Sequence, residues 1–282
     1  MTSHSGKSFS ANNVNAIDCV HCGFVHQDPI PNVAARYREQ FYAIDKPNYL
    51  KEIQRDLEWL LNVQHRLELV LIGTMPKTAL DVGCGSGVFL RLCKTMGCDV
   101  EGVEPDDSVR AGLQKEGLSV YADVTETGKR YDLIRLAWVM EHLSDPAEMI
   151  AQCRARLSEG GKLLLVVPND FSPPQGIAAR KLGKPLYWLH DTHVNYWNTK
   201  RFEIFLNKCD LRAVLMMASF PMEWFLLMGQ NYLSNPEVGE MVHAWRKEME
   251  LTMMRENPGA LIEQSLRFAH AGIGRDLFVV AE

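Results

Sequence analysis

The sequence contains no uninterrupted apolar stretch of the roughly 18 residues that a membrane-spanning helix needs, and Met1 to Asn15 is polar, unlike a signal peptide. Positive charge is also scarce: the net charge is −5 with histidine neutral, and lysine and arginine cluster only as pairs such as Lys200-Arg201. Because a nucleic-acid partner needs a basic surface, we expect no nucleic acid, no membrane span and a cytoplasmic location.

A disulfide framework is also missing, because the 7 cysteines are odd in number and scattered along the chain. The exception is the Cys-x-x-Cys pair of Cys19 and Cys22, which has the spacing of half a structural zinc site. Such a site needs four ligands, and no second pair exists, although His4, His21 or His26 could supplement it. We therefore favour a turn with two free thiols over bound zinc, and we expect no catalytic metal.

The composition fits a globular enzyme. The chain has 282 residues, of which 46% are hydrophobic and 23% are charged. This is enough apolar material for the core of one large domain with appended segments.

The most informative segment is a glycine-rich turn. The apolar run Thr78 to Leu80 leads into Asp81-Val82-Gly83-Cys84-Gly85-Ser86-Gly87, and an amphipathic stretch follows. This order predicts a strand, a tight turn and a helix start. Glycines at alternate positions let a ligand approach the backbone, and the amides that open a helix favour electron-rich atoms. The turn is therefore predicted to bind a ligand.

A second apolar strand, Asp99 to Val103, ends in Glu104, where an acid can accept hydrogen bonds from the ribose hydroxyls of a nucleoside. The glycine spacing differs from the Gly-x-Gly-x-x-Gly fingerprint of dinucleotide sites. Asp81 would repel a pyrophosphate, whereas it suits a ligand with a cationic amino group. A nucleoside that carries an amino acid fits this pattern best.

At this point the sequence resembles the class I S-adenosylmethionine-dependent methyltransferases, specifically small-molecule enzymes like those of the ubiquinone pathway. The motifs that carry the resemblance occur in the family's order: Asp81 to Gly87, Glu104, Ala122-Asp123-Val124, Tyr131 to Leu136, Val139-Met140-Glu141-His142-Leu143 and Gly160 to Pro168. The resemblance implies a Rossmann-like α/β fold with a seven-stranded, mostly parallel sheet, an antiparallel last strand, an N-terminal helical cap and a C-terminal helical insertion.

The resemblance also implies which residues bind the cofactor, S-adenosyl-L-methionine, which becomes S-adenosyl-L-homocysteine. They are Asp81, Gly83, Cys84 and Gly85 at the amino-acid moiety, Glu104 at the ribose, Asp123 and Val124 at the adenine, Leu136 at the sulfonium, and Tyr42 in a lid. Cys84 itself is better explained as a small packing residue. Taken singly, the turn could be a tight connection, Glu104 a solvated strand end and Asp123 a helix cap.

The chain divides into three parts. Residues 1–32 are expected to be an irregular segment, 33–74 a helical cap with helices at about 33–44 and 47–72, and 75–282 the methyltransferase domain. In that domain strands near 78–82, 99–103, 118–121, 131–136 and 162–167 alternate with helices, which predicts a parallel sheet. An insertion at about 222–271 precedes the last strand.

The acceptor side is expected in the segment 169–196, which reads as irregular and follows the end of a strand. The candidate catalytic residues are His193, His142 and His190, because imidazole can remove a proton near neutral pH. Each could instead be a structural histidine. The candidate substrate-binding residues are Tyr196, Trp224, Phe225 and Met228, the last three in a lid, although core packing is the commoner role of such side chains.

The predicted function is methyl transfer from S-adenosylmethionine to a small-molecule acceptor, with oxygen the favoured target atom. Two alternatives remain at this stage. A nicotinamide-dependent oxidoreductase would need the turn to admit a pyrophosphate, and a non-catalytic module would bind the cofactor without an acceptor pocket.

Overall fold

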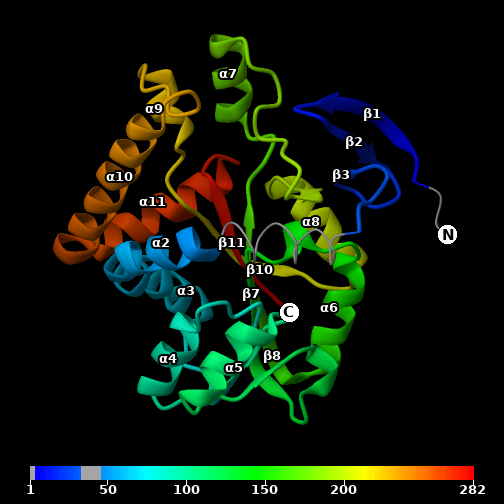
Figure 1. The fold of residues 1–282 in the computed structure, drawn as a ribbon, viewed down its shortest axis with the longest axis vertical. Coiled ribbons are helices and arrows are strands. Elements are labelled where there is room, and N and C mark those ends of the chain that lie inside the picture. Colours follow the sequence, from blue (N-terminus) through cyan, green and yellow to red (C-terminus); the bar gives the residue numbers. More distant parts are fainter. Residues whose placement is uncertain (1–3, 33–45) are drawn as a thin grey trace.

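The computed structural model describes residues 4–32 and 46–282. A seven-stranded sheet with the order β10-β11-β8-β7-β4-β5-β6 forms its centre (Figure 1). The strands are β4 (Thr78–Val82), β5 (Asp99–Val103), β6 (Val120–Tyr121), β7 (Tyr131–Ala137), β8 (Leu157–Pro168), β10 (Ala213–Ala218) and β11 (Asp276–Ala281). The strands from β4 to β8 are parallel, and β11 runs antiparallel to both of its neighbours. The predicted fold class is confirmed.

Helices cover both faces of the sheet. On one face α6 (Pro146–Ala155) and α8 (Thr199–Lys208) contribute to the core, and on the other α3 (His65–Ile72), α4 (Val88–Thr95) and α10 (Pro236–Glu256) do so. Because both faces are covered, the run from Leu163 to Val167 in β8 is fully buried, with its side chains alternating between the two faces. The helix α5 (Asp107–Lys115) packs beside β6.

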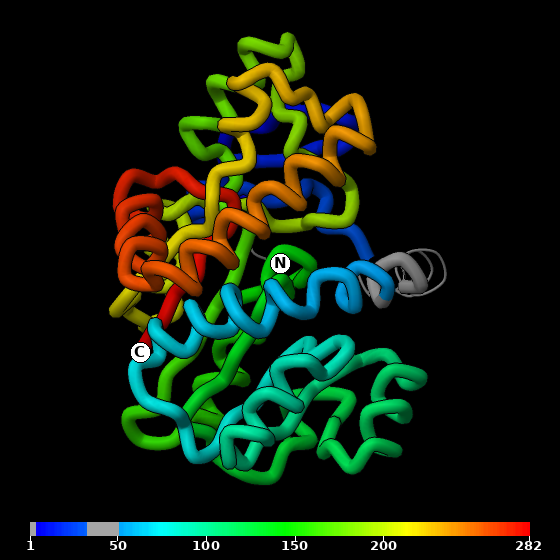
Figure 2. Tube along the Cα trace, turned by 90° about the vertical axis from the view of Figure 1, so that its left-hand side faces the viewer, coloured from blue at the N-terminus to red at the C-terminus, as the bar shows by residue number. Residues whose placement is uncertain are grey.

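The predicted helix at 47–72 is present as α2 (Lys46–Trp59), a π-helical turn η2 (Leu60–Gln64) and α3. Figure 2 shows this run, from blue to cyan, beside the orange α10. Trp59 Nε1 donates a hydrogen bond to Glu250 Oε2 of α10 at 2.7 Å. The predicted helix at 33–44, with the lid candidate Tyr42, lies outside the described residues.

The prediction that residues 1–32 are irregular is wrong. β1 (Gly6–Ala11), β2 (Val14–Cys19) and β3 (Val25–Gln27) pair with β9 (Asn195–Tyr196) in a second, antiparallel sheet. The hairpin between β1 and β2 turns through Asn12 and Asn13, whose φ angles are 52° and 63°. Asparagine tolerates this left-handed conformation, which a two-residue hairpin turn requires.

The segment 169–196 is not wholly irregular, because it contains α7 (Pro173–Leu182). A Ser-Pro-Pro-Gln sequence starts this helix: Gln175 Oε1 accepts a hydrogen bond from the Ser172 amide at 3.2 Å, and Pro173 occupies the first turn. The helix ends at Gly183, whose φ is 62°.

The insertion is helical, as predicted. It consists of α9 (Glu223–Leu227), α10 and α11 (Pro258–His270). Met254 and Leu261 from this region belong to the same hydrophobic cluster as Leu133 of the central sheet, so the insertion is part of the main core. None of the helices in the described residues combines the length and hydrophobicity needed to cross a membrane.

Candidate cofactor and acceptor site

The glycine turn follows β4, as predicted. Gly83, Gly85 and Gly87 have φ angles of 72°, 51° and 75°, which lie in the left-handed region that favours glycine. Space is also restricted, because a Cβ on Gly83 would lie 2.4 Å from Val139 Cγ2. A side chain at Gly83 would therefore force Val139, which follows β7, to move.

Backbone hydrogen bonds fix the turn against the end of β5. The amides of Gly83 and Cys84 both donate to the Val103 carbonyl, at 2.8 and 3.0 Å. The Cys84 side chain is buried beneath Gly102, where an added Cβ would lie 2.8 Å from its sulfur. This placement agrees with the interpretation of Cys84 as a small packing residue.

Glu104 lies beside the turn and is only 5% exposed. Its Oε2 accepts a hydrogen bond from the Gly85 amide at 3.0 Å, and its Oε1 accepts one from the Asp106 amide at 2.9 Å. The two amides thus orient this carboxylate beside the turn.

Asp81 is fully buried at the end of β4 and is paired within the protein. Arg135 Nη1 of β7 donates to Asp81 Oδ1 at 2.8 Å. Asp81 Oδ1 is therefore paired within the protein, and the expected pairing of Asp81 with a ligand's amino group stays a prediction for the other carboxylate oxygen. Asp81 Oδ2 is buried and has no hydrogen-bond partner among the described residues.

Arg135 also makes a bidentate pair with Glu68 of α3, with both nitrogen-to-oxygen distances 3.0 Å. His65 Nδ1 lies 3.0 Å from Glu68 Oε2. Burial alone would raise the pKa of Glu68, but the charge of Arg135 and the contact with His65 together hold it well below its usual range. The π-helical turn η2 directly precedes His65. His65 and Glu68 both lie on the buried face of α3, and this brings Glu68 to Arg135 of β7.

Sequence reasoning missed this buried ionic cluster of Glu68, Asp81 and Arg135. A signal was present, because Arg135 stands between Ile134 and Leu136 in an apolar strand of a parallel sheet. Such strands are buried on both faces, and a charge there requires a partner of opposite sign.

The remaining predicted cofactor residues lie at the ends of neighbouring strands. Asp123 is exposed and caps the short helix η3 (Val124–Glu126), with Oδ1 accepting from the Thr125 amide at 2.8 Å. Val124 is 1% exposed and packs in the core. Leu136 is fully buried near the end of β7, opposite Val82 of β4.

The structure brings the three candidate catalytic histidines together. The ring of His193 lies 3.9 Å from the ring of His190 and 4.9 Å from that of His142, centroid to centroid. His142 Nδ1 lies 2.8 Å from the Thr192 carbonyl. His193 Nδ1 is buried and has no hydrogen-bond partner among the described residues.

Burial lowers the pKa of all three histidines, most strongly that of His193, to which His190, His142 and Arg275 add smaller effects in the same direction. Each imidazole is therefore neutral at pH 7. A neutral imidazole with an unpartnered nitrogen can accept a proton.

Tyr196 and Gln27 bind the backbone of the histidine segment, residues 190–193. Tyr196 Oη donates to the carbonyls of His190 and His193, at 2.7 Å each, and Gln27 Nε2 donates to the His193 carbonyl at 2.7 Å. Tyr196 is fully buried. We assign Tyr196 a structural role in place of the expected contact with the substrate, because its hydroxyl group binds the backbone of this loop.

Glu141 completes a second group with two of these histidines. One ligand atom from each of Glu141, His142 and His193 lies within 4.8 Å of the others. Burial raises the pKa of Glu141 well above its usual range.

Further acids lie where β8 ends and β11 begins. Burial raises the pKa of Asp170 to about 8 and also raises that of Glu223. Tyr187 Oη is 3.4 Å from Glu223 Oε1, and Asp276 Oδ1 is 3.4 Å from Nε1 of Trp138, which follows β7. Asp170 and Asp276 thus place acidic side chains at the end of β8 and at the start of β11.

The expected lid residues have different environments. Phe225 is 8% exposed and packs with Met222 and Val242 inside the insertion. Trp224 packs edge-on against Phe268, and Met228 is 67% exposed at the end of α9. We therefore correct the role of Phe225 from substrate contact to core packing.

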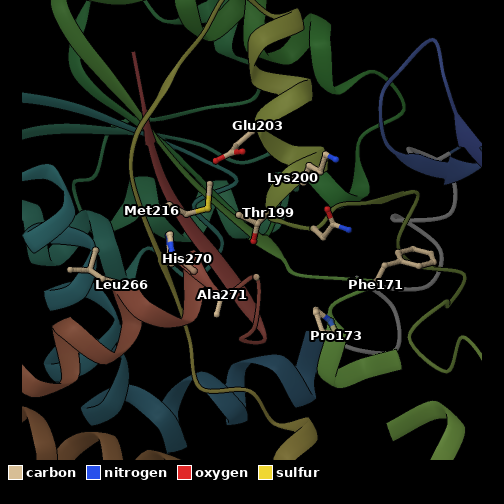
Figure 3. A pocket seen from close by; sticks show the side chains of 12 residues that line it. Phe171, Pro173, Thr199, Lys200, Glu203, Met216, Leu266, His270 and Ala271 are labelled. Carbon is tan, nitrogen blue, oxygen red and sulfur yellow. The ribbon is translucent and has the colours of Figure 1, made fainter. Parts of the chain in front are cut away.

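A cleft of about 600 Å³ lies between α8, β10 and the end of α11 (Figure 3). Thr199, Met216 and His270 are among its lining residues. β11, β8 and β7 separate β10 from β4 in the sheet, so this cleft is distinct from the glycine turn.

The sequence model of a family described as "Methyltransferase domain" matches residues 49–215, more than half of the chain. The chain belongs to this methyltransferase family. A ubiquinone biosynthesis O-methyltransferase from Nitrosomonas europaea is 28% identical over 106 residues, 34% of this chain and 45% of that protein. Its counterpart from Coxiella burnetii is 31% identical over 103 residues, 33% of this chain and 44% of that protein. The matches thus span less than half of the relatives' length.

Solved structures agree with the fold of this methyltransferase. The plantazolicin methyltransferase BamL, in complex with SAH and a triazolic desmethylPZN analog, superposes with a TM-score of 0.54 at 14% identity, covering 88% of this chain and 95% of that chain. A SAM-dependent methyltransferase from Archaeoglobus fulgidus gives 0.50 at 18% identity, covering 83% and 98%. The class I methyltransferase fold is thereby confirmed.

Proposed function

We propose that this methyltransferase transfers a methyl group from S-adenosylmethionine to a hydroxyl oxygen of a small-molecule acceptor. The observation that carries the proposal is the contact between the Gly85 amide and the Glu104 carboxylate. An oriented acid thus lies at the end of β5, directly beside the glycine turn, and this arrangement suits a nucleoside. The names of the O-methyltransferase relatives support oxygen as the target atom.

In this proposal Gly83 and Gly85 pass close to the amino-acid moiety, and Glu104 accepts hydrogen bonds from the ribose hydroxyls. Asp123 and Val124 flank the adenine, and the backbone at Leu136 lies at the sulfonium end. Asp81 contributes indirectly. Its pair with Arg135 anchors the start of the turn, so it is a positioning residue.

Methyl transfer requires few catalytic groups from the protein. The sulfonium is already an activated methyl donor, so the main task is to align the acceptor oxygen with the methyl group. A hydroxyl acceptor also loses a proton, and a neutral base within reach accelerates that step. We assign this role to His193, because its Nδ1 has no hydrogen-bond partner among the described residues and its lowered pKa keeps it neutral. His142 and His190 flank its ring and favour the neutral form.

Replacing His193 with alanine is expected to lower kcat by about 10²- to 10⁴-fold, the usual contribution of a general base. The affinity for S-adenosylhomocysteine should stay unchanged. The contacts of Gln27 and Tyr196 go to the backbone carbonyl of His193, so the substitution leaves them in place. The measurement is transfer of a labelled methyl group to a panel of phenols and catechols, with His270→Ala as the control.

Two further readouts separate a base from a structural residue. Added imidazole should partly restore turnover of His193→Ala. Because burial lowers the pKa of His193, kcat/KM of the wild type should remain constant as the pH falls through about 6.5, the value of a free imidazole, and decrease only below it. Full turnover by His193→Ala on an acceptor of the wild type would contradict the assignment.

A further inference from the structure

The turn between β2 and β3 has the geometry of a metal-binding knuckle. Cys19 ends β2, and Cys22 lies in the turn. The Gly23 amide donates to the Cys19 carbonyl at 2.8 Å, and the Cys22 amide donates to Cys19 Sγ at 3.4 Å. Gly23 has a φ of 86°, which permits the tight reversal. Both sulfur atoms are thus held close together by a closed turn.

Two histidines that are distant in sequence from one another complete a set of four. His4 Nδ1 lies 3.6 Å from Cys19 Sγ and 3.5 Å from Cys22 Sγ. The ring of His26 is 4.5 Å from the ring of His4. One ligand atom from each of the four residues lies within 4.8 Å of the others.

The distances fit a tetrahedral zinc ion. With Zn–S near 2.3 Å and Zn–N near 2.0–2.1 Å, the sulfur-to-nitrogen edge of a tetrahedron is about 3.6 Å. Both measured distances from His4 match this edge. Simple packing of an imidazole ring against two thiols would not require both nitrogen-to-sulfur distances to equal this edge.

His26 provides an independent observation. It is 1% exposed, its Nδ1 lies 2.8 Å from the Gln27 carbonyl, and its Nε2 is buried with no hydrogen-bond partner among the described residues. An Nδ1–H that donates to a carbonyl leaves a lone pair on Nε2. Histidines that bind metals show this arrangement, with the other ring nitrogen donating to a backbone carbonyl.

We propose that His4, Cys19, Cys22 and His26 bind one structural zinc ion. This proposal departs from the expectation of two free thiols, which rested on the missing second Cys-x-x-Cys pair. The ion joins His4, which lies two residues before β1, to the end of β2, the following turn and the middle of β3. The small sheet needs such support, because its own hydrophobic cluster has only five buried residues: Val14, Ala16, Val25, Leu189 and Tyr196.

The site also has a consequence for the acceptor side. β3 carries Gln27, which holds the His193 carbonyl, and β3 pairs with β9 directly after the histidine segment. Loss of the metal should therefore loosen the position of His193 as well as the small sheet.

The test is zinc content and thermal stability of the purified full-length chain. We expect about one zinc per chain by elemental analysis, and a lower melting temperature after chelation, because metal binding contributes to folding. Cys22→Ser and His26→Ala should lose the zinc. His21→Ala is the matched control, because His21 lies between the two cysteines yet is exposed and outside the ligand set.

Substitution by Co²⁺ gives a second readout, since tetrahedral cobalt with thiolate ligands absorbs visible light and the Cys22→Ser protein should lack this band. His142→Ala should keep its zinc, which separates this site from the group around Glu141. Zinc-free wild-type protein that is insensitive to chelation, a Cys19–Cys22 disulfide in its mass spectrum, or zinc lost in His142→Ala but kept in Cys22→Ser would each overturn the proposal.

Discussion

Replacing Arg135 with methionine is expected to lower the free energy of unfolding by about 3–5 kcal/mol, the cost of leaving buried charges without their partner. Arg135 is 6% exposed and joins two buried carboxylates, those of Glu68 and Asp81. Its guanidinium also lies 4.5 Å from the centre of the Phe89 ring. Methionine has similar length but no charge, so both acids would lose their counter-ion.

Urea denaturation measures this loss, and Arg66→Met is the control, because Arg66 lies exposed on α3 close to Glu68 in sequence. Surface changes of that kind usually stay within about 0.5 kcal/mol. Equal stability of Arg135→Met and the wild type would show that the buried cluster contributes nothing to folding.

The same cluster predicts a pH dependence. The pKa of Glu68 is lower in the folded chain than in the unfolded one, so the unfolded chain binds the proton more strongly. The stabilisation from Glu68 is therefore complete above about pH 4.3, the unperturbed value for glutamate, and is lost as the pH falls further. This part of the acid dependence should be absent from Glu68→Gln.

Replacing Gly85 with valine is expected to abolish the binding of S-adenosylhomocysteine at concentrations that saturate the wild type. The φ of Gly85 is 51°, and a β-branched residue there is strained by about 1–3 kcal/mol. To relieve the strain the turn must move, which takes the Gly85 amide away from Glu104.

Isothermal titration calorimetry tests this, with Gly112→Val as the matched control. Gly112 is exposed in α5, and a Cβ there meets no atom within 4 Å. Glu104→Ala should have a smaller effect, a loss of about 1–3 kcal/mol of binding free energy from the charge-assisted hydrogen bonds to the ribose. Normal affinity in folded Gly85→Val and Glu104→Ala proteins would overturn the assignment of the turn.

The central sheet could be predicted because its signals are local. Apolar strands, glycine turns and amphipathic helices alternate between Thr78 and Pro168, and each element agrees with its neighbours. The small N-terminal sheet escaped prediction for a different reason. Two of its strands, β3 and β9, have only three and two residues, and β9 comes from Asn195–Tyr196, far along the chain.

In the candidate site, too, local features could be predicted and long-range contacts could not. Glu104 and the glycine turn follow from spacing along the chain, whereas the pairing of Arg135 with Glu68 joins residues separated by 67 positions. The proposed zinc ligand His4 is likewise 15 residues from Cys19. Contacts of this kind depend on how the helices and strands pack together. Sequence patterns can therefore identify the candidate residues but cannot show which of them lie in contact.

The most direct test of the account is calorimetric titration of the full-length protein with S-adenosylhomocysteine and, separately, with NAD. The glycine turn, the oriented Glu104 and the paired Asp81 predict one binding site for S-adenosylhomocysteine. They predict no binding of NAD at the same concentrations, because the glycine spacing of the turn differs from the Gly-x-Gly-x-x-Gly fingerprint of dinucleotide sites. Binding of NAD without binding of S-adenosylhomocysteine would contradict the account.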